Sequence, residues 1–224
     1  WLTLKRRSWA MALLSGLYFY ISLYFTFSML PLLPLALAWL VLEAWSSNTW
    51  RRPLPWIKLL AALSAGLLLG YVLLRLGLNY DILLRYTHAM EGHRAIKSFE
   101  PGLTFTLEAF FVNTIDLAAW TGFPVFILAV LTCIQAAINF IRSRASRLDA
   151  LLLAFAAVYL ALNLFGQTRG EVGRIWLFML PLLALGAVRQ IRQMFDGQSK
   201  WVYLFLAMQF ISVFLTFQFQ DFFA

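Results

Sequence analysis

The stretch WAMALLSGLYFYISLYFTFSMLPLLPLALAWLVLEAW, from Trp9 to Trp45, decides the fold because it is almost entirely apolar and contains one carboxylate, Glu43. A helix needs about 20 apolar residues to cross a bilayer, and this stretch is far longer. Pro31 and Pro34 interrupt it, and a proline inside a helix removes a hydrogen bond and clashes with the preceding turn. The stretch therefore predicts two short crossings joined by a tight turn.

The composition of the whole chain points the same way. Of its 224 residues, 62% are hydrophobic and 12% are charged, whereas soluble domains have about 45–50% and about 25%. We therefore expect an all-α, polytopic integral membrane helix bundle. The single cysteine, Cys133, cannot form a disulfide within the chain. The chain begins at Trp1 rather than at a methionine, and we expect it to be part of a longer polypeptide.

Further apolar runs predict about seven crossings, in a single transmembrane domain over residues 1–224. The predicted spans are 9–27, 32–45, 56–76, 118–141, 148–165, 171–189 and 201–219. The segment 79–117 is richer in polar residues, and its later part is predicted to be a helix in the outer interface. Asn139, Asn163 and Gln209 lie within spans, where we expect them to form interhelical hydrogen bonds.

The basic residues indicate an orientation. When the loops alternate across the membrane, most of the 18 Lys and Arg residues fall on one side, including the N-terminal cluster and the Arg142–Arg147 turn. The positive-inside rule makes that side cytoplasmic. The prediction is a multi-pass protein of the cell membrane with its N-terminus in the cytoplasm and its C-terminus outside. Membrane anchoring accounts for the net charge of +8, so we expect contact with membrane lipids and no nucleic acid.

A charged stretch overlaps the start of the sixth predicted span and reads Gln167-Thr168-Arg169-Gly170-Glu171-Val172-Gly173-Arg174. The apolar run after it is too short to cross a bilayer as a helix. The crossing helix would therefore have to include Glu171 and Arg174, which places them near or in the apolar layer. Ionisable groups at that depth are costly and are usually functional. One alternative is purely structural, since Glu171 and Arg174 can neutralise one another three residues apart on a helix. The other is a phosphate or diphosphate, because Arg169 would still need a counter-charge and the backbone N–H groups at the two glycines suit an anion.

A second group of candidate residues, His88, His93 and Arg94, lies in the outer segment. Five residues place the two histidines about 140° apart on a helix, so that one metal ion would not readily contact both. Their spacing also differs from that of the His-Glu-x-x-His zinc motif. We expect no cofactor, with a divalent metal as the less favoured alternative. The histidines and Arg94 are otherwise solvated loop residues or side chains that bind a polar substrate.

The string Arg169-Gly170-Glu171-Val172-Gly173-Arg174-Ile175-Trp176-Leu177-Phe178, with Pro181 after it, resembles the late motif of polytopic prokaryotic membrane proteins related to the GT-C glycosyltransferases. The histidine-containing segment, a helix with Asn113 and Asp116, and Gly122-Phe123-Pro124 at the start of a span resemble their layout. The similarity covers most of this chain and corresponds to the C-terminal half of such a protein. It implies transfer of a sugar from a polyprenyl-phosphate carrier on the outer membrane face. By the same resemblance, Arg169 and Arg174 would hold the carrier phosphate and Glu171 would orient them.

One feature departs from the family pattern. Such enzymes usually carry a catalytic Asp or Glu in their first outer loop, whereas Phe27–Pro34 contains no carboxylate. No catalytic residue is assigned, and whether the chain is an enzyme stays open. The alternative function is a non-catalytic integral membrane subunit that packs against partner membrane proteins in a larger complex. A transporter is less favoured, because the sequence places no ionisable pathway within the membrane.

Overall fold

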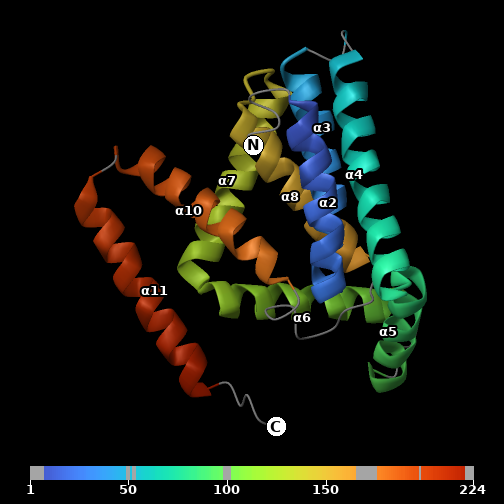
Figure 1. Cartoon of the computed structure of the whole chain (residues 1–224). Coiled ribbons are helices and arrows are strands. Elements are labelled where there is room, and N and C mark those ends of the chain that lie inside the picture. The colour runs from blue at the N-terminus through green and yellow to red at the C-terminus, as the bar shows by residue number, and fades with distance from the viewer. Residues whose placement is uncertain are drawn as a thin grey trace. The chain divides into compact units, whose positions relative to one another are not determined.

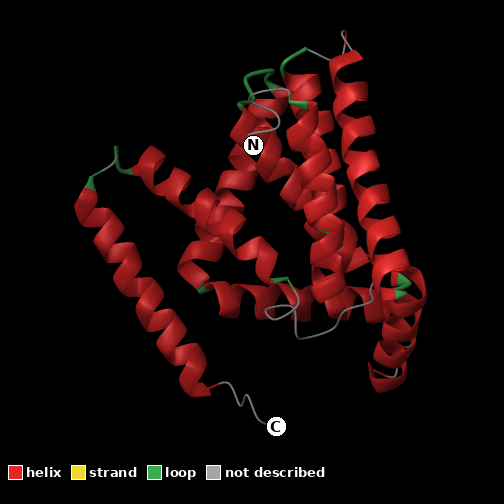
Figure 2. Cartoon of the chain, in the orientation of Figure 1, coloured by secondary structure: helices red, strands yellow, loops and turns green. Residues whose placement is uncertain are grey.

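The computed structural model describes residues 8–48, 51, 54–97, 102–164, 176–196 and 198–219, and the regular elements in these ranges are all helices (Figures 1 and 2). The all-α class is thereby confirmed. The chain divides into two compact units, one formed by Trp1–Leu33 with Ser47–Phe99 and the other by Pro34–Ser46 with Glu100–Ala224. Over the described ranges, three α-helices belong to the first unit and six belong to the second.

Several helices have the length and composition of membrane spans. Four of them, Phe27–Ser46, Leu54–Leu78, Phe123–Ile141 and Arg147–Leu164, are long and apolar enough to cross a membrane. Trp9–Phe25 and Lys200–Thr216 are apolar but shorter. These helices support the coarse prediction of a multi-pass membrane protein, in which the exposed apolar side chains face lipid.

Five of the predicted spans coincide with helices to within a few residues. These helices are α2 (Trp9–Phe25), α3 (Leu32–Ser46), α4 (Leu54–Leu78), α8 (Arg147–Leu164) and α11 (Ser199–Phe219). The break between the first two lies where the prolines predicted it. Helix α2 ends at Phe25, a 3-10 turn follows at Phe27–Met29, and Pro34 lies in the first turn of α3, where its missing N–H has no intrahelical partner to lose.

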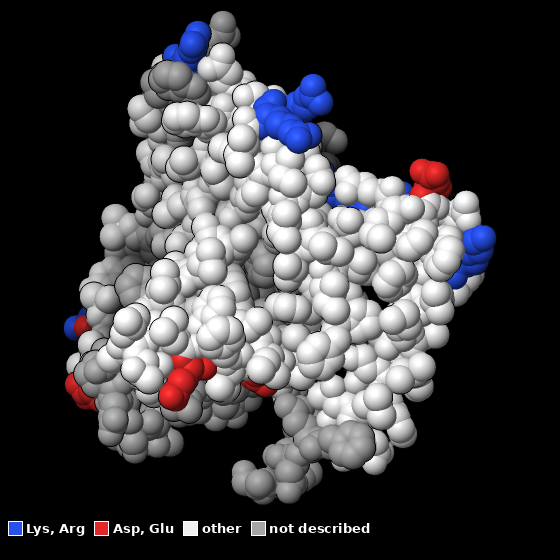
Figure 3. All heavy atoms as spheres, turned by 180° about the vertical axis from the view of Figure 1, so that it is seen from behind, with Lys and Arg blue, Asp and Glu red and all other residues white. Residues whose placement is uncertain are grey.

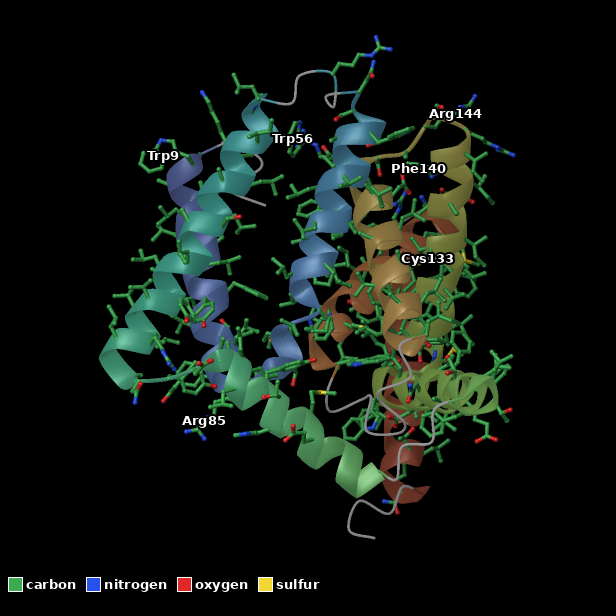
Figure 4. The ribbon with its side chains drawn as sticks, turned by 90° about the vertical axis from the view of Figure 1, so that its right-hand side faces the viewer. Trp9, Trp56, Arg85, Cys133, Phe140 and Arg144 are labelled. Carbon is green, nitrogen blue, oxygen red and sulfur yellow. The ribbon has the colours of Figure 1, made fainter. Side chains whose placement is uncertain are left out.

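In the first unit, α2 and α4 run side by side in the same direction (Figures 1 and 4). Their backbones touch at two glycines, since a Cβ at Gly16 would overlap the carbonyl oxygen of Leu63 and a Cβ at Gly66 would overlap that of Leu13. Small residues at such crossings are typical of helix pairs in membranes. Trp9 and Trp56 lie at the same end of the pair (Figure 4).

The third helix of this unit, α5 (Ile82–Lys97), follows α4 after a short turn. Asp81 caps α5, because its Oδ1 accepts hydrogen bonds from the N–H groups of Leu83 and Leu84 at 3.1 and 3.2 Å. Its Oδ2 lies 2.9 Å from Nη1 of Arg75 in the last turn of α4. The capping carboxylate thus also links the two helices.

The core of the second unit is formed by α6 (Leu103–Thr121), α7 (Phe123–Ile141), α8 and α10 (Leu180–Met194). Helix α6 lies across the end of α7 (Figure 1). Small side chains at the contacts let these helices approach closely. The buried apolar residues include Ala109, Leu117, Leu128, Ala129, Ala136, Ala150, Leu152, Ala154, Phe155, Leu183 and Ala187.

The prediction of a span beginning at Ala118 was wrong at its start. Helix α6 continues to Thr121, the chain breaks at Gly122, and α7 begins at Phe123. Gly122 has φ +86°, a conformation that residues with a Cβ rarely adopt. Pro124 occupies the first turn of α7, which pre-organises a new helix rather than continuing the old one. The later part of the predicted outer segment is a helix, as expected.

The predicted helix 171–189 also differs from the structure. Over the described residues, the regular helix begins and ends later in the chain than predicted. Residues 165–175 lie outside the described ranges, a 3-10 turn occupies Leu177–Met179, and the regular helix α10 extends from Leu180 to Met194. Pro181 therefore lies in the first turn of α10 and does not kink a continuous helix. The first-turn N–H groups have no intrahelical acceptor, so proline is tolerated there at no cost in hydrogen bonds.

Candidate functional site

The charged stretch identified in the sequence lies outside the described residues, so the structure gives no contacts for Arg169, Glu171 and Arg174. His88 belongs to α5 and is exposed. His93 and Arg94 also belong to α5, but their side chains are outside the described part of the structure. The site must therefore be built from the residues that flank the charged stretch in the second unit.

A buried pair of asparagines lies at the first flank. Asn163, in the last turn of α8, accepts a hydrogen bond from Nδ2 of Asn113 in α6 at 3.0 Å and donates its own Nδ2 to the carbonyl of Tyr159 at 2.9 Å. Both asparagine side chains are fully buried. Such a bond is strong in a low-dielectric interior, and losing either partner is costly. The pair therefore fixes the end of α8 against the middle of α6.

After the charged stretch, the first described residue is held by aromatic packing. Trp176, the first described residue after the charged stretch, is 2% exposed, and its ring meets the edge of Tyr159 with centroids 5.9 Å apart. The Tyr159 hydroxyl forms a hydrogen bond with the Thr114 hydroxyl of α6. Edge-to-face aromatic contacts of this kind add to the stabilisation from burial. Tyr159 thus joins α8, α6 and Trp176 at one point.

Asn163 and Tyr159 of α8 contact α6 at the same place, because Asn113 and Thr114 are adjacent residues. The structure therefore joins α8 to the middle of α6 through the Asn163–Asn113 and Tyr159–Thr114 hydrogen bonds, and Trp176 packs on Tyr159. Two carboxylates also belong to α6. Asp116, one helical turn after Asn113, is partly buried, and Glu108 is exposed. The middle of α6 thus carries amide, hydroxyl and carboxylate groups.

A second polar cluster lies at the other end of α7 and α8. Asp149 of α8 accepts hydrogen bonds from the N–H and Oγ of Ser146, both at 2.7 Å, and from Nδ2 of Asn139 in α7 at 3.4 Å. Arg189 of α10 places its Nη2 2.7 Å from the Asp149 Oδ1. Ser146 and Asp149 form a reciprocal capping box at the start of α8. This cluster fastens three helices together and leaves Asp149 only 1% exposed.

The sequence reasoning missed the Asp149–Arg189 pair and the aromatic contact of Trp176. The Ser-x-x-Asp spacing of Ser146 and Asp149 is a recognisable helix-start signal, but no sequence pattern pairs Asp149 with Arg189. The expectation that Asn139, Asn163 and Gln209 form interhelical hydrogen bonds is confirmed, since they contact Asp149, Asn113 and the carbonyl of Thr121 respectively. Within the described ranges, no group of three or more His, Cys, Asp and Glu side chains could hold a metal ion.

Charge is distributed unevenly over the second unit. The α7–α8 turn carries exposed Arg142, Arg144 and Arg147, whereas α6, which adjoins the opposite end of α7, carries Glu108 and Asp116. Figure 3 shows basic side chains at the turn and acidic ones at the opposite end, and Figure 4 shows Arg144 beyond the last turn of α7. The two polar clusters of the unit thus differ in the sign of the charge that surrounds them.

Comparisons of the chain with protein-family models, with curated proteins and with solved structures find no match.

Proposed function

We propose that this chain is the C-terminal part of a membrane glycosyltransferase that takes a sugar from a polyprenyl-phosphate carrier on the outer membrane face. The observation that supports the proposal is that described residues near the two ends of the 165–175 segment, Asn163 and Trp176, both contact the α6–α8 pair, Asn163 through Asn113 and Trp176 through Tyr159. The charged stretch of that segment is the candidate site for the carrier phosphate.

The charges of the stretch favour an anion. Arg169 and Arg174 exceed the single carboxylate of Glu171 by one positive charge, and arginine binds phosphate oxygens through two parallel hydrogen bonds. In this proposal the two arginines hold the phosphate and Glu171 orients them. His88, His93 and Arg94 of α5 remain candidates for binding a polar substrate in their own unit. A polyprenyl-phosphate carrier is a membrane lipid, and the candidate membrane spans would place the chain in the same bilayer.

The proposed orientation follows from the basic α7–α8 turn. Seven crossings, with the N-terminus in the cytoplasm, place Arg142, Arg144 and Arg147 inside and α6 outside. Helix α6 and the charged stretch then lie at the outer interface, where a carrier phosphate would be found. A carrier presented on the cytoplasmic face would not reach this site.

The test is binding of a polyprenyl phosphate to the purified protein in lipid nanodiscs. In the Arg169→Ala/Arg174→Ala variant we expect the dissociation constant to rise at least about a hundredfold, because the loss of two charged hydrogen bonds of about 1.5–3 kcal/mol each removes about 3 kcal/mol or more. The matched control is Arg142→Ala/Arg144→Ala, which removes two exposed arginines at the other end of α7. A polyprenol without phosphate should bind weakly to all three proteins.

Three outcomes would decide against parts of the proposal. Equal affinity of the wild type and the Arg169→Ala/Arg174→Ala variant for the polyprenyl phosphate would remove the phosphate site. Phosphate-dependent binding without sugar transfer by the full-length protein would instead favour the alternative function, a non-catalytic membrane subunit of a larger complex. Co-purification of a stoichiometric membrane protein partner would support the same alternative.

A further inference from the structure

The junction between α6 and α7 leaves backbone groups without helical partners. Helix α6 ends at Thr121 and α7 begins at Phe123, with Gly122 between them at φ +86°. The last carbonyl groups of one helix and the first N–H groups of the next have no intrahelical partner. Thr121 and Gly122 are buried, so water does not readily satisfy the Thr121 carbonyl, whereas Phe123 is exposed. An unsatisfied backbone group within the apolar layer of a membrane is expensive.

Two side chains of α11 bind this junction. Nε2 of Gln209 donates to the carbonyl oxygen of Thr121, and the N–H of Phe123 donates to Oγ of Ser212 at 3.2 Å. Gln209 and Ser212 are three residues apart and therefore share one face of α11. A Cβ at residue 122 would overlap the Gln209 amide, so the glycine also provides the space that the glutamine occupies.

Helix α11 has few other attachments in the described structure. Its large apolar side chains are mostly exposed, for example Tyr203 at 68%, Leu206 at 59% and Phe210 at 74%. Near its start, Phe205 packs against the cluster of Leu128, Ala187 and Ile191. The junction is the second point of attachment, and it is a polar one. Lipid can replace apolar contacts along the rest of α11 but cannot replace these two hydrogen bonds.

We propose that Gln209 and Ser212 are positioning residues that clamp the α6–α7 junction and so fix the direction of α6 relative to α7. Helix α6 is then held at two points, by the clamp at its C-terminal end and by the Asn113–Asn163 bond at its middle. The clamp therefore determines the position of Asn113 and Thr114 on α6 relative to α7. This inference does not depend on which ligand the charged stretch binds.

The test compares the Gln209→Leu/Ser212→Ala variant with the wild type by hydrogen–deuterium exchange in nanodiscs. We expect the backbone amides of residues 117–126 to exchange at least about tenfold faster, because two hydrogen bonds that restrict local opening are lost. The amides of residues 153–163 in α8 should exchange at the wild-type rate. The matched control is Gln218→Leu, which changes an exposed glutamine of the same helix and should leave both segments unchanged.

A distance measurement separates positioning from a general loss of stability. Spin labels at Ile115→Cys in α6 and Ile134→Cys in α7, both exposed positions, are introduced in a Cys133→Ser background. The variant should broaden or shift the label-to-label distance distribution, and the Gln218→Leu control should not. If the double variant fails to fold, Ser212→Ala alone removes one hydrogen bond with little change in volume and should show the same local effect. Unchanged exchange and distance, or acceleration that is equal in α8, would overturn the clamp.

Discussion

Arg189 and Asp149 form an ion pair between α10 and α8, with Nη2 and Oδ1 2.7 Å apart. The Asp149 side chain is 1% exposed and that of Arg189 is 15% exposed. Asn139 and Ser146 donate the remaining hydrogen bonds to the carboxylate. A carboxylate can be buried so completely because its charge is paired and its lone pairs are satisfied.

Replacing Asp149 by asparagine should therefore be strongly destabilising. The Asp149→Asn variant keeps the side-chain shape but leaves Arg189 largely buried without a counter-charge, a loss that typically costs about 3–5 kcal/mol. Thermal unfolding of the purified protein in detergent should show a clear fall in Tm. Asp196→Asn, which changes an exposed aspartate just after α10, is the control and should leave Tm unchanged.

The double variant Asp149→Leu/Arg189→Met removes both charges of the same ion pair. Removing both charges leaves no uncompensated ion, and buried ion pairs are often replaced by apolar residues at little net cost. Its Tm should therefore lie above that of Asp149→Asn. A Tm below that of the single variant would mean that the hydrogen bonds of Asp149, rather than its charge, hold α8 in place.

The Asn113–Asn163 pair should behave as a coupled unit. Asn163→Leu leaves the buried Nδ2 of Asn113 without this acceptor, at a cost of about 1–3 kcal/mol. In Asn113→Leu/Asn163→Leu, the second substitution should cost less than it does alone, because its partner is already absent. Unfolding free energies of the two single variants and the double variant give the coupling directly, and strictly additive losses would contradict it.

Two glycines of α4 should respond in opposite ways to alanine. At Gly66 a Cβ overlaps the Leu13 carbonyl of α2, whereas at Gly77 nothing lies within 4 Å. Gly66→Ala should separate α2 from α4 and lower Tm. Gly77→Ala should leave it unchanged or raise it, since alanine is favoured over glycine in a helix by about 1 kcal/mol. Equal effects of the two substitutions would show that the helices do not touch at Gly66.

Pro181→Ala should be close to neutral. Pro181 lies in the first turn of α10, where proline removes no intrahelical hydrogen bond. Circular dichroism and thermal unfolding should therefore change little, by no more than about 1 kcal/mol in unfolding free energy. A gain in helical signal of a full turn or more would instead indicate that the proline interrupts a longer helix.

The long apolar stretches made the helix positions readable, because each candidate span needs about 20 apolar residues and offers few ways to place them. Pro31 and Pro34 placed the break between α2 and α3 correctly for a local reason, the missing N–H. The start of α7 was misplaced because Ala118, Ala119 and Trp120 are apolar like α7 itself, whereas the backbone conformation of Gly122 and the proline at Pro124 begin a new helix at Phe123. The roles of Arg169, Glu171 and Arg174 stay predictions.

The sequence by itself determined that this protein is helical and belongs in a membrane, since hydrophobicity and proline act through composition and local geometry. Only the tertiary structure decided that Asp149 meets Arg189, that Asn113 meets Asn163, and that Gln209 meets the Thr121 carbonyl. Such pairs join residues far apart in the chain, and any of several polar side chains could have satisfied the same hydrogen-bonding need. Which partner is chosen depends on how the helices cross, and side chains at many contacts set that geometry together.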